Sequence, residues 1–288
     1  MDTAELMKKV RQIEIKMKGL NTQLFSGEYH SAFKGRGMSF SEVREYSYGD
    51  DVRNIEWNVT ARAGHPYVKI FEEERELTLI LLIDVSKSLQ FGTVEKTKKE
   101  TMLEIAAVLA FSALTNNDKV GAIFFSNEVE GYLPPKKGRA NVLKLIRQLL
   151  TIEPKSKTTD VSKALNYLNN IQKKRCIVFA LSDFLSPDYE KALTLTAKRH
   201  DLIGVNVFDR YETDLPKELG MLPVIDAENG GFFYLDAGEK NFRASYFADH
   251  QDQVNKFTGL FRKYGAHALT ISTEDDYIKS LIDMFRRR

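Results

Sequence analysis

Five carboxylate or hydroxyl side chains stand where apolar segments end or a helix-like pattern begins. In chain order they are Asp84, Ser86, Ser88, Thr159 and Asp183. The first three follow the apolar run 77–83, the last follows the run 177–181, and the threonine precedes a helical pattern at 161–168. Carboxylates and hydroxyls are hard oxygen ligands, which suit Mg²⁺ or Mn²⁺ rather than zinc. These residue types therefore suggest binding of a divalent cation.

The charge of this set matters more than the number of its ligands. Serine and threonine hydroxyls are neutral, so at most two carboxylates face the cation, and one or both can act through water. A cation held in this way keeps electrophilic character and an exchangeable position. The natural occupant of that position is a carboxylate supplied by another molecule.

Each of these residues also has a purely local explanation. Ser86 and Ser88 could cap the turn after their strand, and Asp183 could cap the helix that follows it. Thr159 could cap the next helix together with Asp160. The order of the motifs, with two at strand ends and one at a helix start, favours the metal site. Thr158 remains an alternative to Thr159 as the threonine ligand.

The elements that would position these residues alternate between strand and helix. Apolar strands are predicted at 77–83, 120–125, 177–181, 202–208 and 267–271, and helices at 101–114, 142–150, 161–168, 187–198, 242–264 and 277–285. Continuous apolar strands between helices indicate an α/β fold with a mostly parallel sheet covered on both faces. The carboxyl ends of such strands share one edge, where sites form. Asn229-Gly230 also predicts a hairpin between 222–225 and 232–235.

The first part of the chain has a different pattern. Apolar residues at helical spacing in 6–20 predict a helix that packs on the protein's own core. The Gly-rich stretch 25–64 indicates turns and short strands, and 67–71 indicates a strand. The charged run 72–76 then marks a boundary. We therefore predict a leader, residues 1–75, and a main domain, residues 76–288.

The leader contains a group of charged residues that invites two interpretations. Its members are Arg44, Asp50, Asp51, Arg53 and Arg62. They could form a polar binding surface, but we favour a buried ion-pair network that fixes the leader to the main domain, with Trp57 as its apolar anchor. The glycines at 35, 37 and 49 are expected to permit turns, because they do not follow a buried strand and open a helix as phosphate-binding loops do.

The composition excludes several classes of protein. The 288 residues include 42 Lys or Arg and 40 Asp or Glu, and the leader holds 12 of each kind, which argues against a nucleic-acid binder. The single cysteine, Cys176, excludes an internal disulfide or multi-cysteine metal site and is expected to be buried. No apolar run is long enough to cross a bilayer. We therefore expect a cytoplasmic protein without a membrane span.

The five oxygen-bearing residues resemble the metal-ion-dependent adhesion site of von Willebrand factor A domains. Asp84-x-Ser86-x-Ser88 matches the first motif, Thr159 the second and Asp183 the third. The resemblance implies a von Willebrand A-like, Rossmann-type fold and a magnesium site formed by these residues. In that family the open position of the metal accepts a Glu or Asp from the binding partner.

A second resemblance covers nearly the whole chain. The segments that carry it are Gly35-Arg36-Gly37-Met38-Ser39-Phe40, Val43-Arg44-Glu45-Tyr46, Gly49-Asp50-Asp51-Val52-Arg53-Asn54-Ile55-Glu56-Trp57, Ala61-Arg62, Phe71-Glu72-Glu73-Glu74-Arg75 and Val207-Phe208-Asp209-Arg210-Tyr211-Glu212. They resemble the bacterial "domain of unknown function 58" family, whose members carry an A-like domain after this leader. Members often accompany MoxR-type AAA+ ATPases, so the resemblance implies such an ATPase, or its client, as the partner.

Two functions follow from these observations. The first is a cytoplasmic protein-interaction module that uses Mg²⁺, or Mn²⁺, to engage an acidic residue of its partner. The alternative is a Mg²⁺-dependent phosphoryl-transfer enzyme that uses Asp84 as the nucleophile. Phosphatases of the haloacid-dehalogenase type resemble this arrangement but require a second aspartate two residues later, where this chain has Ser86. Because no catalytic set is complete, we favour the interaction module.

Overall fold

The computed structural model describes residues 8, 10–15, 27–29, 31–33, 39–72, 77–90, 96–153, 156, 158–225 and 231–288. They form two compact units, one of Met1–Ala32 with Thr78–Arg288 and one of Phe33–Leu77. This division differs from the predicted leader of residues 1–75, because the first helical residues belong to the larger unit. There Val10 is buried, and buried Glu14 accepts hydrogen bonds from Arg139 at 2.7 and 2.8 Å. The predicted helix beyond residue 15 lies outside the described residues.

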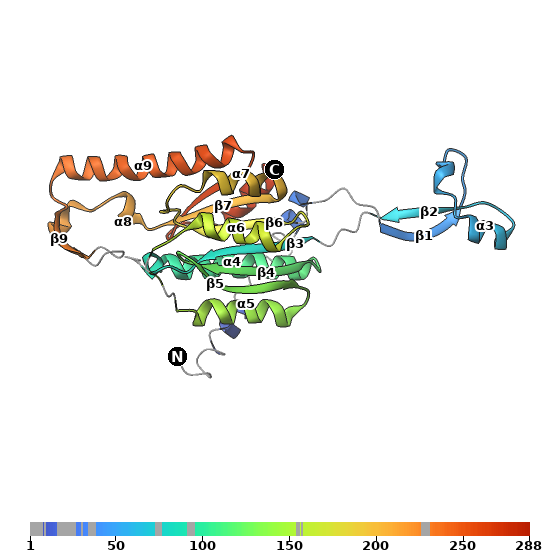
Figure 1. Ribbon diagram of the computed structural model, residues 1–288, viewed down its shortest axis with the longest axis horizontal. Helices are drawn as coiled ribbons and strands as arrows, with labels where there is room; N and C mark the ends of the chain where they lie inside the picture. The colour runs from blue at the N-terminus through green and yellow to red at the C-terminus, as the bar shows by residue number, and fades with distance from the viewer. Residues whose placement is uncertain are drawn as a thin grey trace. The chain divides into compact units, whose positions relative to one another are not determined.

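A six-stranded sheet forms the centre of the larger unit, in the order β10-β7-β6-β3-β4-β5 (Figure 1). Its parallel strands are β3 (Thr78–Asp84), β4 (Lys119–Phe125), β6 (Ile177–Ser182), β7 (Asp201–Phe208) and β10 (His267–Ser272). The edge strand β5 (Val129–Lys136) is antiparallel to β4. The predicted class, a mostly parallel sheet flanked by helices, is confirmed.

Strand β5 is absent from the strands predicted above. It contains Pro134 and Pro135, and most of its side chains are only partly buried. Proline removes a backbone donor and is tolerated in sheets mainly at edges. The apolar pattern that reveals the central strands is therefore missing here.

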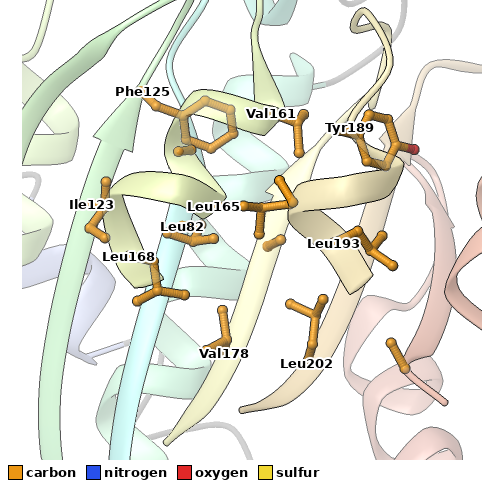
Figure 2. Close-up of a cluster of buried hydrophobic side chains, with 14 of the residues drawn as sticks. Leu82, Ile123, Phe125, Val161, Leu165, Leu168, Val178, Tyr189, Leu193 and Leu202 are labelled. Carbon is orange, nitrogen blue, oxygen red and sulfur yellow. The ribbon is translucent and has the colours of Figure 1, made fainter. Parts of the chain in front are cut away.

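Helices cover both faces of the sheet. They are α4 (Lys98–Thr115), α5 (Arg139–Thr151), α6 (Val161–Ile171), α7 (Glu190–Arg199), α9 (Lys240–Lys263) and α10 (Tyr277–Arg286). On one face, residues of α6 and α7 such as Leu165 and Leu193 pack over the strand residues Leu82 and Val178 (Figure 2). On the other face, Phe285 of α10 meets Phe179 of β6 edge to face.

Helix α4 begins three residues before its predicted start. Thr97 and Glu100 form a reciprocal capping box, in which each side chain accepts a hydrogen bond from the other residue's backbone N–H. Lys98 therefore becomes the first residue of the helix, a position that matters for the site described below. Thirteen of the 18 residues of α4 are buried, since the helix packs against α5, β3, β4 and β7.

Short elements follow the ends of several strands. They are the 3₁₀ turn Lys87–Gln90, α8 (Arg210–Thr213) and the 3₁₀ turn Lys217–Leu219. The predicted hairpin is confirmed, with β8 (Met221–Ile225) antiparallel to β9 (Phe232–Asp236). Its turn residues Asn229 and Gly230 lie outside the described residues. Within the parts of the chain that the structure describes, no helix is both long and apolar enough to cross a membrane.

The smaller unit consists of an antiparallel strand pair with short helical segments. Its elements are β1 (Ser39–Glu45), the 3₁₀ turn Val52–Asn54, α3 (Trp57–Ala63) and β2 (Tyr67–Glu72). This agrees with the predicted turns and short strands, including the strand at 67–71. At Gly49 the backbone φ is 107°, so this glycine permits a turn as expected. Gly35 and Gly37 lie outside the described residues.

Within the smaller unit the charged residues form two local pairs rather than one network, and their role in fixing the leader to the main domain stays a prediction. Arg44 binds Asp50 at 2.7 Å and Arg53 binds Asp51 at 2.6 Å, and both arginine side chains are well exposed. Each pair joins residues close in sequence and closes its own turn. Among the described residues of this unit Arg62 has no ion-pair partner, and Trp57 is 69% exposed.

Candidate metal centre

The topology brings the three predicted motifs to one edge of the sheet. Strands β3 and β6 are parallel neighbours, with Ile83 opposite Leu181, so Asp84 and Asp183 emerge side by side. The segment before α6 is tied to the end of β4, because the Asp160 backbone N–H donates to the Ser126 carbonyl at 2.9 Å. These connections place Thr159 at the same edge as the two aspartates.

The five side chains form one connected set of oxygens. The Ser86 and Ser88 hydroxyls lie 3.0 Å apart, and Ser88 donates to Asp183 Oδ2 at 3.1 Å. On the other side of the site, the Thr159 hydroxyl donates to Asp84 Oδ2 at 3.3 Å. The Ser86 backbone N–H donates to Asp84 Oδ1 at 2.8 Å and so joins the two halves. Ser88 is partly exposed, whereas the other four residues are buried.

These spacings fit a small, hard cation. Mg²⁺ binds oxygens at about 2.0–2.1 Å in octahedral geometry, so neighbouring ligand oxygens lie about 2.9 Å apart. The contacts of 3.0 and 3.1 Å through Ser88 are close to that value. For binding, the hydroxyl protons of Ser86, Ser88 and Thr159 would turn away from the centre so that the oxygen lone pairs face the ion. By spacing and by donor type, the residues present fit the ion that the sequence motifs imply.

The structure distinguishes between Thr158 and Thr159, the two threonines that the sequence offers as the possible metal ligand. Thr159 contacts Asp84, whereas the Thr158 hydroxyl lies 3.3 Å from that of Ser156. Thr159 is therefore the threonine of the cluster. Asp160 instead serves the local role considered above, since its carboxylate caps α6 by accepting from the Lys163 backbone N–H at 3.1 Å.

Lys98 is the functional neighbour that the sequence analysis missed. Its ammonium donates to Asp183 Oδ2 at 3.0 Å and to Glu212 Oε1 at 2.6 Å, and its side chain is only 1% exposed. Glu212 is held in turn because it accepts from the Asp209 backbone N–H in the capping box of α8. The available signal was the capping-box pattern Thr97-x-x-Glu100, which fixes the start of α4 at Lys98.

Ser182 is a second missed residue. Its hydroxyl donates to Asp84 Oδ2 at 2.6 Å and accepts from the Phe184 backbone N–H at 3.0 Å. Phe184 has a left-handed φ of 54°, which marks the sharp turn after β6. Ser182 thus fixes the orientation of Asp84, and its position just before Asp183 was the only signal in the sequence.

The two aspartates of the site have different electrostatic surroundings. Burial, followed by the charge of Asp183, raises the pKa of Asp84 above its ordinary value, although hydrogen bonds from Ser182 and Ser86 oppose this. A cation placed among these oxygens would favour the charged carboxylate. Burial by itself would lower the pKa of Lys98, but the charges of Asp183 and Glu212 outweigh it and raise that pKa. Lys98 is therefore a permanent internal cation beside the site.

Other metal chemistry has no comparable support. Within the described ranges, no three His, Cys, Asp or Glu side chains are grouped so that they could hold a metal ion. Cys176 is buried beside His200, with its sulfur 3.3 Å from Nδ1, and burial raises the pKa of its thiol to about 12. This residue is a core thiol, as expected.

A comparison with family models identifies the family. The model described as "Protein of unknown function DUF58" matches residues 42–256. The chain belongs to this family. An uncharacterized protein of Mycobacterium tuberculosis is 28% identical to this DUF58 chain over 286 residues, which cover 98% of the chain and 89% of the relative. An uncharacterized protein of Mycobacterium bovis matches to the same extent.

Solved structures with a similar fold share little sequence with this DUF58 protein. The hypothetical protein BatB of Bacteroides thetaiotaomicron has a TM-score of 0.45 and 14% identity, and the match covers 74% of this chain and 100% of that one. The SpRpn10 VWA domain has a TM-score of 0.41 and 13% identity, over 73% and 95%. A mussel byssus matrix protein described with a zinc-occupied MIDAS motif has a TM-score of 0.41 and 14% identity, over 74% and 47%.

Proposed function

We propose that this DUF58 protein is a metal-dependent protein-interaction module. The observation that carries the proposal is the connected set of oxygens from three separate segments, Asp84 to Ser88, Thr159 and Asp183. Local capping does not require contacts between residues 75 and 95 positions apart, as Thr159 makes with Asp84 and Ser88 with Asp183. The fold thus gathers hydroxyls and carboxylates from three segments at one point, where a shared cation could bind them.

Each member of the site has a distinct part in this proposal. Asp84 and Asp183 supply the negative charge, and the hydroxyls of Ser86, Ser88 and Thr159 supply neutral oxygens. Bound Mg²⁺, or Mn²⁺, would offer its remaining position to a carboxylate from the partner. Because only two carboxylates belong to the protein, the cation would keep enough positive charge to attract a third.

Neighbouring residues hold the two aspartates ready. Ser182 orients Asp84, and Lys98 orients Asp183 through the contacts given above. Access is available on the side of Ser88, which is partly exposed, and of Leu185, which is 42% exposed. A partner side chain can therefore reach the site without unfolding of the surrounding turns.

The alternative of phosphoryl transfer by Asp84 lacks a supporting observation. Asp84 is 2% exposed, and both of its carboxylate oxygens already accept hydrogen bonds. The carboxylate is therefore surrounded by hydrogen-bond donors and is not exposed to a substrate, as a nucleophile would be. The position of the second aspartate that such enzymes use is occupied by the buried Ser86.

The proposed partner is a MoxR-type AAA+ ATPase or its client. The proposed site of this interaction is the cytoplasm. Membership of the DUF58 family, together with the family resemblance described above, supports this choice. The partner's contribution would be an exposed Glu or Asp that completes the coordination of the metal.

Calorimetric titration with Mg²⁺ tests the metal site. Asp84→Asn removes one charge from the site, and Asp160→Asn removes one charge from the adjacent position while leaving an asparagine that can still cap α6. We expect saturable Mg²⁺ binding by the wild type and by Asp160→Asn, and none by Asp84→Asn. Equal binding by all three chains would disprove the site.

Capture of a purified MoxR-type ATPase from the same organism tests the function. Wild-type chain should retain the ATPase in Mg²⁺ and release it in EDTA, and Asp84→Asn should fail in both conditions. Thermal unfolding of each variant shows whether it remains folded. Equal capture under every condition would contradict a metal-dependent interaction.

A further inference from the structure

A cavity lies directly beside the candidate metal centre. Its volume is about 310 Å³, and Asp183 forms part of its wall. The rest comes from Leu185 after β6, from the end of β7, from α8 and from α9, with Asn206, Glu212 and Asp249 among the lining residues. A second cavity of about 340 Å³ shares Asp183 and Asn206 with the first. Because Asn206 pairs with Ser182 in the sheet, it stands next to the metal-site strand end.

Asn206 carries an unused hydrogen-bond acceptor. The residue is 5% exposed, and its buried Oδ1 atom accepts no hydrogen bond from any residue that the structure describes. Buried side-chain oxygens are nearly always paired, and an exception calls for an explanation such as a missing ligand. Since Asn206 lines both cavities, a donor group placed there would satisfy this oxygen.

The charge around the cavity is negative. Among the described lining residues, Asp183, Glu212 and Asp249 contribute three carboxylates, and the ammonium of Lys98 pairs with the first two. Asp249 is exposed and makes no ion pair within the described part of the chain. Burial lowers the pKa of His250, and although Glu212 opposes the shift, the charge of Lys98 adds to it, so the neutral imidazole is favoured. A cationic group is therefore favoured over an anionic one.

The remaining walls suit a planar cation. Phe208 and His250 lie with their ring centroids 5.0 Å apart, and Tyr246 is a further lining residue. Aromatic faces attract cations, and a guanidinium combines such stacking with hydrogen bonds to several acceptors at once. The volume is at the lower end for ligand pockets, which matches a side-chain head group rather than a whole cofactor.

We propose that this cavity binds the guanidinium of a partner arginine, next to the acidic residue that the metal engages. The inference rests on the proposed function in that one partner segment supplies both side chains. The arginine would donate to Asp249 and Asn206 and lie against the aromatic wall. The partner is thereby defined as a segment that carries an acidic and a basic residue close together, rather than any exposed carboxylate.

Binding of N-acetyl-arginine amide tests the cavity directly. N-acetyl-citrulline amide is the matched control, because it has nearly the same shape without the charge. Methyl NMR signals of Leu185 and Val254, which both line the cavity, report binding and also show that the chain is folded. We expect saturable shifts with the arginine probe and about tenfold weaker binding of the citrulline probe, as loss of an ion pair and a cation–π contact predicts.

Variants of α9 show whether the named residue is responsible. Asp249→Asn should weaken arginine binding to the level of the citrulline probe, whereas Asp252→Asn, an equal charge change at an exposed position of the same helix outside the cavity, should leave it unchanged. Equal affinity for the two probes, or an Asp249→Asn variant that binds like the wild type, would overturn the proposal.

The same measurement in EDTA and in Asp84→Asn separates this inference from the proposed function. Selective arginine binding that survives both conditions supports the cavity on its own. If the calorimetric titration shows no Mg²⁺ binding while arginine still binds selectively, the metal-dependent function fails and the cation pocket stands. If Mg²⁺ binds and arginine is not preferred to citrulline, the metal site stands and the pocket is refuted.

Discussion

The sequence singles out two pairs of aspartates as candidate functional residues, but one pair is buried and the other lies at the surface of its unit. Asp84 and Asp183 are buried and lie 99 positions apart, and Asp183 binds the buried Lys98. Asp50 and Asp51 are adjacent in sequence and bind arginines on the surface of the smaller unit. A dense local cluster of charges thus proved to be a set of solvated turn contacts, and two scattered residues proved to be neighbours.

The difference has a physical origin. Charges that face water lose little on forming a pair, and such pairs contribute about 0–1 kcal/mol. Buried charges must be compensated, so their partners are held in fixed geometry and losing one is costly. Carboxylates that are buried and held in fixed positions are also better suited to bind a metal ion or a partner. The following variants compare the two regions in this respect.

Removal of the internal cation should have the largest effect. Lys98→Met leaves Asp183 and Glu212 without their shared partner, so we expect a loss of about 3–5 kcal/mol in the free energy of unfolding. Urea denaturation followed by circular dichroism measures it. The control is Lys96→Met, since Lys96 pairs with Glu104 near the same helix start but is 36% exposed, and it should cost at most about 1 kcal/mol. Equal losses in the two variants would show that burial of Lys98 has no energetic consequence.

Magnesium should stabilise one region and not the other. At free Mg²⁺ of about 100 times its Kd, binding to the native state alone adds about 2.7 kcal/mol. Hydrogen exchange should therefore slow at the amides of β3 and β6 in wild-type protein and remain unchanged in Asp84→Asn. The β1–β2 amides of the smaller unit should exchange at the same rate with and without Mg²⁺. Uniform slowing in both units would indicate a general salt effect instead of a site.

Loss of one orienting hydroxyl should have an intermediate effect. Ser182→Ala deprives Asp84 Oδ2 of its 2.6 Å donor in a fully buried setting, which should cost about 2 kcal/mol. Ser47→Ala is the counterpart in the smaller unit, where the hydroxyl lies 3.4 Å from Arg44 on the surface. That change should stay within about 0.5 kcal/mol. Unfolding midpoints of the two variants provide the comparison, and a Ser47→Ala effect as large as that of Ser182→Ala would refute it.

The part of this difference that can be predicted from the sequence depends on one signal, the continuous apolar residues of buried strands. Central strands such as β3 and β6 are visible because burial on both faces demands continuous apolar residues. The meeting of Asp84 with Asp183 then follows, since parallel strands end at one edge. Strand β5 was missed because an edge strand can carry prolines and partly exposed residues.

The contacts of Lys98 could not be predicted from apolar patterns of this kind. Lys98 and Glu212 are 114 positions apart and carry no periodic pattern, so only the folded chain shows that they meet. In the sequence, Lys98 looks like Lys96 and Lys99 beside it. For the same reason the sequence did not reveal that Arg44 and Arg53 each pair locally with a neighbouring aspartate, because closeness in sequence says nothing about burial.

The smallest effect is expected at the exposed Asp51–Arg53 pair, where the pKa should change while the free energy of unfolding at pH 7 does not. A side-chain hydrogen bond from Arg53, followed by one from its backbone N–H, lowers the pKa of Asp51 to about 2. Arg53→Ala keeps the backbone donor, so this pKa should rise part of the way to the ordinary value of about 3.9 in a carboxyl NMR titration. Because the folded-state pKa lies below the unfolded one, any stability from the pair is present above about pH 4 and is lost as pH falls towards 2. Water screens this pair, so the urea midpoint at pH 7 should not move, and a clear drop there would mean that the surface aspartates resemble the buried ones after all.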